Sequence, residues 1–232
     1  MTLVLGIDCS GETYSAGLWS SSGIALEAAG QQPRTALRQL PETIAYLLKT
    51  AGVEAGDLSA VGVTRGPGSF TGVRLGVTVA KTAAMVAGCP VLGWDTLEVL
   101  AHQALGSDGA GVVPRGTVAV ALDARRSELY CGVFRGDGEQ LEVLVETDVR
   151  RPEDFAAALP GPFQVAVGTG FEAYPQLLPA GFEGASLASR AASAPNGLLV
   201  ARLTGSASDR WIPASELETV YHRRADIQVS GS

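Results

Sequence analysis

The chain has 232 residues, of which 46% are hydrophobic and 18% are charged, and its net charge is -7. These values fit one large domain or two small ones with a real core, and they exclude a disordered chain. The longest stretch without a charged residue, 155–171, is interrupted by Pro160 and Pro162, so it does not form a spanning helix of roughly 20 residues. The first residues lack the basic leader and apolar core of an export signal. We therefore expect a cytoplasmic protein without a membrane segment.

Cysteine, histidine and charge patterns also limit the chemistry. Cys9, Cys89 and Cys131 are an odd number at unrelated spacings, which favours buried free thiols over disulfides or a metal cluster. The two histidines, His102 and His222, lie far apart, and neither has a second ligand at helical spacing, so no metal site is predicted. The acidic net charge repels phosphate backbones, so the isolated chain is expected to bind nucleic acid weakly or not at all.

The first half of the chain has the pattern of a three-strand meander followed by alternating helices and strands. Short apolar or alternating runs between polar turns predict strands, and apolar residues at helical spacing predict helices. The predicted elements are strands 3–7, 14–19 and 24–29, helix 37–51, strand 60–64, helix 73–87, strand 91–93 and helix 96–104.

The second half begins in the same way. Residues 4–8 match 119–123 at a shift of 115, and the match of small and apolar residues continues without a gap. A shift of nearly half the chain predicts two copies of one unit, the first over 1–108 and the second over 109–232. The predicted elements of the second copy are strands 118–122, 128–134 and 141–145, a helix near 152–158 and a strand at 164–167, after which the pattern becomes short and irregular.

This duplicated order of antiparallel strands, then parallel strands separated by helices, is that of the ribonuclease H-like half-domain. The predicted fold class is α/β with two such half-domains, as in the actin, hexokinase and Hsp70 group (actin-like, ASKHA), the second being shortened. In ATP-handling members an aspartate ends the first strand of each half, and Asp8 and Asp123 stand in those positions. The turn 124–128 has no glycine that would let a phosphate approach the backbone, although Arg125 and Arg126 offer positive charge.

The glycine-rich segment 64–76, TRGPGSFTGVRLG, connects a predicted strand to a predicted helix. Its glycines permit tight turning, and a serine or threonine can cap the helix, whose exposed amides would form an anion site. The segment is neither a Walker loop nor a nucleophile elbow. Its residues fit a structural turn and a ligand loop equally well. The candidate anion or loop site comprises Asp8, Gly66, Gly68, Ser69, Thr71 and Gly72.

Several motifs of the chain together resemble one family. These are GPGSFTGVR at 66–74, DARRSELY at 123–130, GTG at 168–170 and VYHR at 220–223, with Asp8 closing the first strand. They closely resemble the TsaB (YeaZ) family, and the likeness covers nearly the whole chain. The resemblance implies a non-catalytic subunit in the bacterial synthesis of the threonylcarbamoyl group on adenosine 37 of ANN-decoding tRNAs.

One departure from the family concerns the first helix. Family members commonly carry a histidine just ahead of it, where this chain has Arg34, Thr35 and Ala36. If that histidine contacts a partner, the contact is altered here.

The resemblance also implies partners. They are a TsaD-like catalytic paralogue and a TsaE-like P-loop ATPase, with ATP used by the partners and tRNA contacted only through the complex. No cofactor, metal or catalytic residue is implied in this chain, which favours a degenerate enzyme fold kept as a binding surface. Two alternatives stay open. One is a small ATP-dependent kinase of the same superfamily that keeps Asp8 and Asp123, and the other is a glycoprotease-like hydrolase, for which no nucleophile and base are visible.

Two helices carry the predicted partner interface. Helix 73–87 has apolar residues on two faces, one for the sheet and one, rich in alanine, for close contact with another helix. The alternative is burial of both faces within its own domain. The chain alone is expected to form a homodimer through the helices beginning at Thr35 and Thr71. If Ala84 lies in this interface, Ala84→Arg should give a folded monomer. If Ala84 lies under its own sheet, the same substitution should unfold the chain. The candidate interface residues are Leu40, Ile44, Leu47, Leu48, Val73, Arg74, Val77, Ala80, Lys81 and Ala84.

Overall fold

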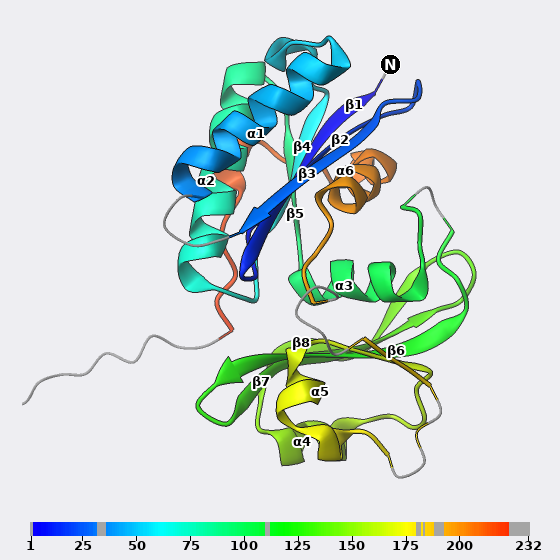
Figure 1. Ribbon diagram of the computed structural model, residues 1–232. Helices are drawn as coiled ribbons and strands as arrows, with labels where there is room; N and C mark the ends of the chain where they lie inside the picture. The colour runs from blue at the N-terminus through cyan, green and yellow to red at the C-terminus, as the bar shows by residue number, and fades with distance from the viewer. Residues whose placement is uncertain are drawn as a thin grey trace, which may run out of the picture.

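The computed structural model describes residues 2–31, 36–109, 112–179, 182, 184–187 and 193–222. They form two five-stranded sheets, one above the other in Figure 1, with α3 between them. Each sheet consists of an antiparallel meander whose first strand pairs in parallel with a later strand. The predicted α/β fold with two ribonuclease H-like half-domains is confirmed.

The two sheets have equivalent strand orders. The order is β3-β2-β1-β4-β5 in the N-terminal half and β8-β7-β6-β9-β10 in the C-terminal half. The predicted duplication is therefore present in the topology. The N-terminal elements are β1 (Leu3–Asp8), β2 (Thr13–Ser20), β3 (Ala25–Gln31), α1 (Ala36–Ala51), β4 (Ala60–Thr64), α2 (Phe70–Ala87), β5 (Val91–Trp94) and α3 (Thr96–Leu105). The C-terminal elements are β6 (Gly116–Arg125), β7 (Glu128–Gly136), β8 (Leu141–Arg150), α4 (Pro152–Ala158), β9 (Val165–Val167), α5 (Thr169–Ala173), β10 (Ala185–Leu187) and α6 (Gly197–Ser206). Short 3-10 turns lie at Ala55–Asp57, Pro175–Leu177, Ser208–Arg210 and Ala214–Glu216.

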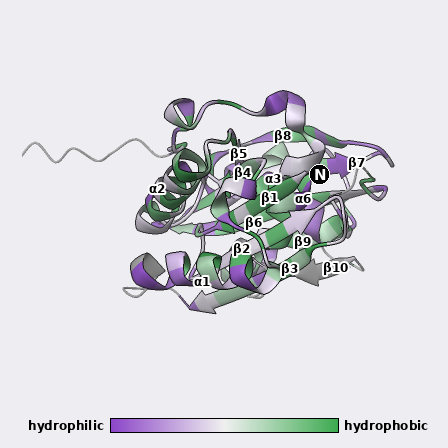
Figure 2. Cartoon of the chain, turned by 90° about the horizontal axis from the view of Figure 1, so that it is seen from above, coloured by the Kyte–Doolittle hydropathy of each residue, from purple (hydrophilic) through white to green (hydrophobic). Residues whose placement is uncertain are grey.

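Burial follows the position of each strand in its sheet. Every residue of β1 and β4 is buried because helices cover both faces of these central strands, and their sequences are almost continuously apolar. The edge strand β3 alternates between exposed and half-buried residues. In Figure 2 the central strands are mainly hydrophobic, whereas hydrophilic residues interrupt α1.

The helix α6 lies directly on the N-terminal sheet, on the face opposite α1 and α2 (Figure 1). Gly6 is paired with Gly17 on one side and with Gly62 on the other, so three adjacent strands lack side chains at one level. A Cβ on Gly6 would lie 2.2 Å from the Gly197 carbonyl oxygen, and one on Gly17 would lie 2.2 Å from the Leu198 nitrogen. The glycine row therefore permits backbone contact between sheet and helix.

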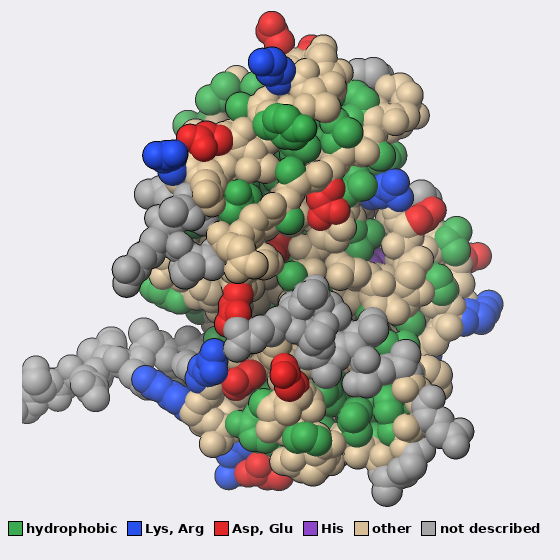
Figure 3. Space-filling view, viewed as in Figure 1, with side chains coloured by type: hydrophobic (Ala, Val, Ile, Leu, Met, Phe, Trp, Pro, Cys, Tyr) green, Lys and Arg blue, Asp and Glu red, His purple; other side chains and the backbone are tan. Residues whose placement is uncertain are grey.

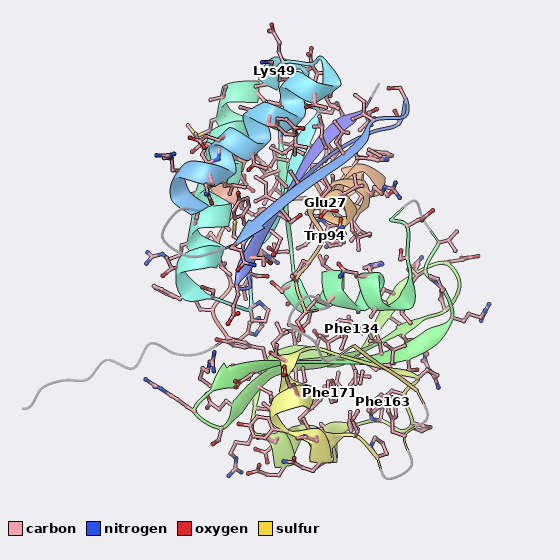
Figure 4. All side chains as sticks on the ribbon, in the orientation of Figure 1. Glu27, Lys49, Trp94, Phe134, Phe163 and Phe171 are labelled. Atoms are coloured by element: carbon pink, nitrogen blue, oxygen red, sulfur yellow. The ribbon has the colours of Figure 1, made fainter. Side chains whose placement is uncertain are left out.

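The helix α3 makes the reciprocal contact on the C-terminal sheet. Leu97 and Leu100 pack against Val118 and Val120, and Phe134 joins the same core. Figure 4 shows Phe134 beneath α3, whereas Phe163 and Phe171 lie on the opposite face of this sheet, in a separate core. The last helix of each half thus covers the sheet of the other half.

Residues 211–222, here called the C-terminal strap, also return to the N-terminal half. Ile212 pairs with Val91 on the edge strand β5, and Leu217 is buried in the N-terminal core. The helix α6 and the strap thus pack on the N-terminal sheet, although they follow the predicted boundary at residue 108 in the sequence. Neither was predicted, since the repeat becomes irregular in this part of the sequence.

Two further predictions, on the cysteines and on membrane-spanning helices, can be compared with the structure. None of the three cysteines of the chain, all of which lie in the described part, forms a disulfide. Cys9 and Cys131 are buried, as predicted, whereas Cys89 is half-buried. Among the described residues, no helix is both long enough and apolar enough to cross a membrane.

Candidate functional site: the outer face of α2

The two sides of α2 differ sharply in burial. The helix begins at Phe70, three residues earlier than predicted, because the Ser69 side chain accepts a hydrogen bond from the Gly72 N–H as the N-cap. Along one stripe, at intervals of three or four residues, lie Phe70, Arg74, Thr78, Thr82 and Met85, all exposed. Phe70 is 59% exposed, Met85 74% and the neighbouring Val86 71%, so apolar groups remain in contact with water at both ends of the stripe.

Most of the predicted interface residues face the other way. The alanine-rich face of α2, which the sequence assigned to a partner helix, packs on its own sheet, where Ala84 is 1% exposed. The alternative of burying both faces does not hold either, because the outer stripe is exposed. The inner face of α1 also packs on this sheet, and Leu48 lies partly buried at the border of that face. Small residues suit close approach to a sheet as well as to a helix, which is why sequence alone assigned the wrong face. The residues in the core are Leu40, Ile44, Leu47, Val73, Val77, Ala80 and Ala84.

A groove of about 420 Å³ separates α2 from the C-terminal strap. Lys81 was predicted to meet a partner, but its Nζ donates hydrogen bonds to the carbonyl oxygens of Leu217, at 3.0 Å, and Ser215, at 3.4 Å. Lys81 therefore holds the strap. The groove is lined by Arg74, Val77, Thr78, Lys81, Leu217, Glu218, Thr219 and Tyr221.

An aromatic pair closes one end of this face. The rings of Phe70 and Tyr221 lie with their centroids 5.5 Å apart, although Tyr221 is 51% exposed. The Arg74 guanidinium carbon lies 4.9 Å from the centroid of the Phe70 ring, within the range of a cation–π contact. The exposed side of α2, here called the α2 outer face, therefore combines exposed aromatic and aliphatic groups with a positive charge. It consists of Phe70, Arg74, Thr78, Thr82, Met85 and Val86.

The glycine-rich loop forms the turn from β4 into α2. Gly66 has φ 116° and Gly68 has φ 157°, and a Cβ on Gly68 would lie 2.3 Å from the Ser10 carbonyl oxygen. The Ser69 N–H donates to that oxygen at 2.7 Å, whereas Thr71 is exposed. The loop thus packs against the turn after β1, which supports the structural interpretation. Anion binding by its amides stays a prediction.

Asp8 ends β1, as predicted, and is buried. Its Oδ1 accepts hydrogen bonds from the Ser10 hydroxyl at 2.6 Å, the Thr64 hydroxyl at 2.5 Å and the Ser10 N–H at 3.1 Å. Burial raises the pKa of the Asp8 carboxyl from 3.8 to about 6, and the hydrogen bonds from Ser10 and Thr64 limit that rise. This carboxyl is engaged by groups of its own half-domain.

Substituting Asp8→Asn should make stability less dependent on pH. Because the folded-state pKa is above the unfolded value, ionisation of Asp8 costs stability progressively between about pH 4 and pH 6. The full cost is about 3 kcal/mol at 1.36 kcal/mol per pKa unit. Urea denaturation should show the variant more stable than the parent at pH 8, by up to this amount, with the gap shrinking toward pH 4.

Thr64→Val serves as the control, because losing a donor to the carboxylate should widen the pH dependence. A gap between parent and Asp8→Asn that is equal at pH 8 and pH 4.5 would contradict the assigned cause.

Asp123 lies near the end of β6, also as predicted. Its Oδ1 accepts a hydrogen bond from the Arg125 N–H at 2.8 Å, and its Oδ2 lies 3.6 Å from Arg125 Nη1. The hairpin tip is unusual because Arg125, Arg126 and Ser127 have φ between 55° and 64°. The turn itself lies at 124–128, as the sequence predicts, but its three consecutive left-handed residues without glycine were not expected.

A polar cluster at the junction of the halves was also missed. Asp95 caps α3 by accepting from the Leu97 N–H, at 2.7 Å, and the Glu98 N–H, at 3.1 Å. Burial raises the pKa of Glu98 to about 7, and burial together with the Arg210 charge lowers the pKa of His102 to about 4. The capping pattern at 95–98 was a usable sequence signal for the helix start, but not for the approach of Arg210, which comes from a distant segment.

The comparisons with known proteins agree with this fold. Residues 24–192 match the family model described as TsaD: tRNA N6-adenosine threonylcarbamoyltransferase. The Escherichia coli tRNA threonylcarbamoyladenosine biosynthesis protein TsaB is 32% identical over 180 residues, which are 75% of this chain and 74% of that protein. The Haemophilus influenzae protein of the same name is 30% identical over 200 residues, covering 82% and 80% of the two chains.

Two solved structures from Pseudomonas aeruginosa are similar over almost the whole chain. One is YeaZ, with a TM-score of 0.78 and 30% identity over 95% of this chain and 100% of that chain. The other is described as an uncharacterized protein with similarity to peptidase YEAZ, with a TM-score of 0.81 and 30% identity over 96% and 100%. The sequence matches and the solved structures each cover most of this chain. The chain therefore belongs to the TsaB (YeaZ) family of the actin-like superfamily.

Proposed function

We propose that this chain is a cytoplasmic, non-catalytic scaffold in the synthesis of the threonylcarbamoyl group on adenosine 37 of ANN-decoding tRNAs. Its α2 outer face docks a TsaD-like catalytic paralogue, and a TsaE-like P-loop ATPase joins the complex. The partners use ATP, and this chain needs no cofactor of its own. When alone, the chain forms a homodimer through the same face.

The observation that carries the proposal is the exposure of large apolar side chains on one helix. Phe70, Met85 and Val86 of α2, with Tyr221 beside Phe70, are four of the seven large hydrophobic residues that are exposed among the described residues. A partner that covered them would remove this area from water, at about 25 cal/mol per Å². The relatives named for threonylcarbamoyladenosine biosynthesis supply the pathway.

Two further features support a scaffold rather than an enzyme or a tRNA-binding chain. The Asp8 carboxyl, which would be associated with a metal in a kinase of this superfamily, is buried against Ser10 and Thr64. On the face in Figure 3, the Lys and Arg side chains of the described residues lie scattered among Asp and Glu side chains, without a continuous basic patch. Phosphate backbones are therefore better held by other chains of the complex.

Putting acidic residues on the α2 outer face should weaken docking without unfolding the chain. In the double variant Met85→Glu and Val86→Glu, both side chains are exposed, so circular dichroism should match the parent. Two carboxylates in an apolar contact are expected to weaken binding of the TsaD-like paralogue at least tenfold, as measured by calorimetry. Light scattering should also show that the variant is monomeric.

Val143→Glu is the matched control, because Val143 is exposed on β8 in the other half and lies outside the docking face. It should bind the paralogue like the parent. Parental affinity in the double variant would overturn the assigned face. Turnover of MgATP by the isolated chain, or a tRNA gel shift at submicromolar protein, would overturn the scaffold function itself.

A further inference from the structure

We infer that the C-terminal strap couples the α2 groove to the junction between the two half-domains, so that docking at one is transmitted to the other. The inference rests on the proposed function in that the α2 outer face is the docking surface. It concerns the regulation of that surface, and its first test uses the isolated chain.

The strap begins as part of the N-terminal sheet. Ile212 exchanges two backbone hydrogen bonds of 2.9 Å with Val91 on β5, and Lys81 then holds the strap through the Leu217 and Ser215 carbonyl oxygens. A Cβ on Gly93 would lie 2.8 Å from Leu217 Cδ1, so β5 leaves room for the Leu217 side chain. This part of the strap forms one wall of the groove beside α2.

The strap then continues from the groove to the glycine-rich loop. The Val220 N–H donates to the Arg65 carbonyl oxygen at 2.8 Å, and the Tyr221 ring lies on Phe70. A Cβ on Gly66 would lie 2.7 Å from the Val220 carbonyl oxygen, so strap and loop are in close contact. A partner that displaces Tyr221 therefore moves the backbone attached to this loop.

His222, at the end of the described strap, reaches the junction of the halves. Its Nε2 lies 4.0 Å from Asp95 Oδ2, which is within ion-pair distance but too long for a hydrogen bond, and the two side chains are 16% and 25% exposed. The other oxygen of the same carboxylate caps α3 and accepts a hydrogen bond from the Thr147 hydroxyl on β8 at 3.2 Å. Asp95 is thus contacted by the strap, by the helix that covers the C-terminal sheet and by that sheet itself.

These contacts make one continuous chain from the groove to the junction. Lys81 and Tyr221 line the groove, residues 217–222 connect them to His222, and Asp95 connects His222 to Thr147. A ligand shifts such an arrangement only by binding one state better than another, and the coupling acts equally in both directions. Loosening either end should therefore loosen the other.

Hydrogen exchange on Lys81→Met tests the first direction. The substitution removes the ammonium but keeps a long helix-forming side chain on α2. We expect exchange at least tenfold faster in the strap and also at the start of α3 and in β8 around Thr147. Lys49→Met makes the same substitution on an exposed position of α1, where Figure 4 shows Lys49 at the far end of the half-domain, and should leave these amides unchanged.

Thr147→Val tests the reverse direction, because it removes the hydroxyl donor to Asp95 and keeps the shape of the side chain. Faster exchange at Val220 and His222 supports the coupling. Changes confined to the strap in Lys81→Met, or to β8 in Thr147→Val, overturn it. A uniform rise that includes β2 and β3 overturns it too, because that result reports general loss of stability.

Adding the TsaD-like paralogue extends the test to the complex. Protection should rise along α2 and, if the ends are coupled, also around Asp95 and Thr147. Protection on α2 alone refutes the coupling and leaves the proposed function intact. Coupled exchange in the isolated chain with no binding of the paralogue refutes the proposed function alone.

Discussion

Ala84→Arg is expected to unfold the N-terminal half rather than to release a folded monomer. Ala84 is 1% exposed and lies in the core formed by α1, α2 and the sheet. A guanidinium placed there loses its hydration without a partner, and its volume does not fit a packed core. The combined cost of several kcal/mol is a large part of a total stability of about 5–15 kcal/mol. Circular dichroism at 25 °C should show lost helix, with a lowered Tm for any folded remainder.

Val86→Arg is the matched control, since the same side chain is introduced two residues further along the same helix at a position that is 71% exposed. It should fold like the parent, with a stability change within about 0.5 kcal/mol. A folded, monomeric Ala84→Arg protein would instead return Ala84 to the docking surface.

Gly6→Ala should be nearly as damaging, although it adds one methyl group. The new Cβ would lie 2.2 Å from the Gly197 carbonyl oxygen and 2.3 Å from the Ala201 nitrogen, both backbone atoms of α6. No rotamer relieves this clash, so the helix has to move off the sheet. We expect a loss of about 3 kcal/mol or more, measured by urea denaturation, because overpacking usually costs 1–3 kcal/mol and here displaces a whole helix.

Gly56→Ala provides the comparison, because a Cβ at Gly56 meets no atom within 4 Å. This change should be neutral or stabilising by up to about 1 kcal/mol, since alanine lowers the entropy of the unfolded chain. Equal stability of the two variants would mean that α6 does not lie as close to β1 as described.

Local periodicity predicted the elements of the first half almost completely, because each strand or helix there has its own apolar pattern and turn residues. The alanines of α2 show where such reasoning stops. Alanine permits close approach to any neighbour, so Ala80 and Ala84 fit a partner helix in the sequence and their own sheet in the structure. The exposed Met85 and Val86 were the better indicators, but exposure depends on which face the sheet covers.

The helix α6 was missed although its sequence carried a signal. Asn196 is an N-cap, and small residues recur every four positions at Gly197, Ala201 and Gly205. That spacing indicates a helix pressed against another backbone, and the glycines of β1, β2 and β4 are its counterpart. For the site, Asp8 and Asp123 were placed by the internal repeat. The contacts of Asp95 with Thr147 and His222 could not be predicted, because only the tertiary fold brings these residues together.

The exchange of α3 and α6 between the halves affects the order in which the protein forms during its synthesis. One face of the N-terminal sheet is covered by a helix that is translated roughly 100 residues after the last strand of that sheet, since β5 ends at Trp94 and α6 begins at Gly197. At roughly 5–20 residues per second, that separation corresponds to roughly 5–20 s with one face of the sheet bare. The first sheet to be translated is therefore the last to be fully covered, and a nascent chain in that interval presents an apolar surface that a chaperone would recognise.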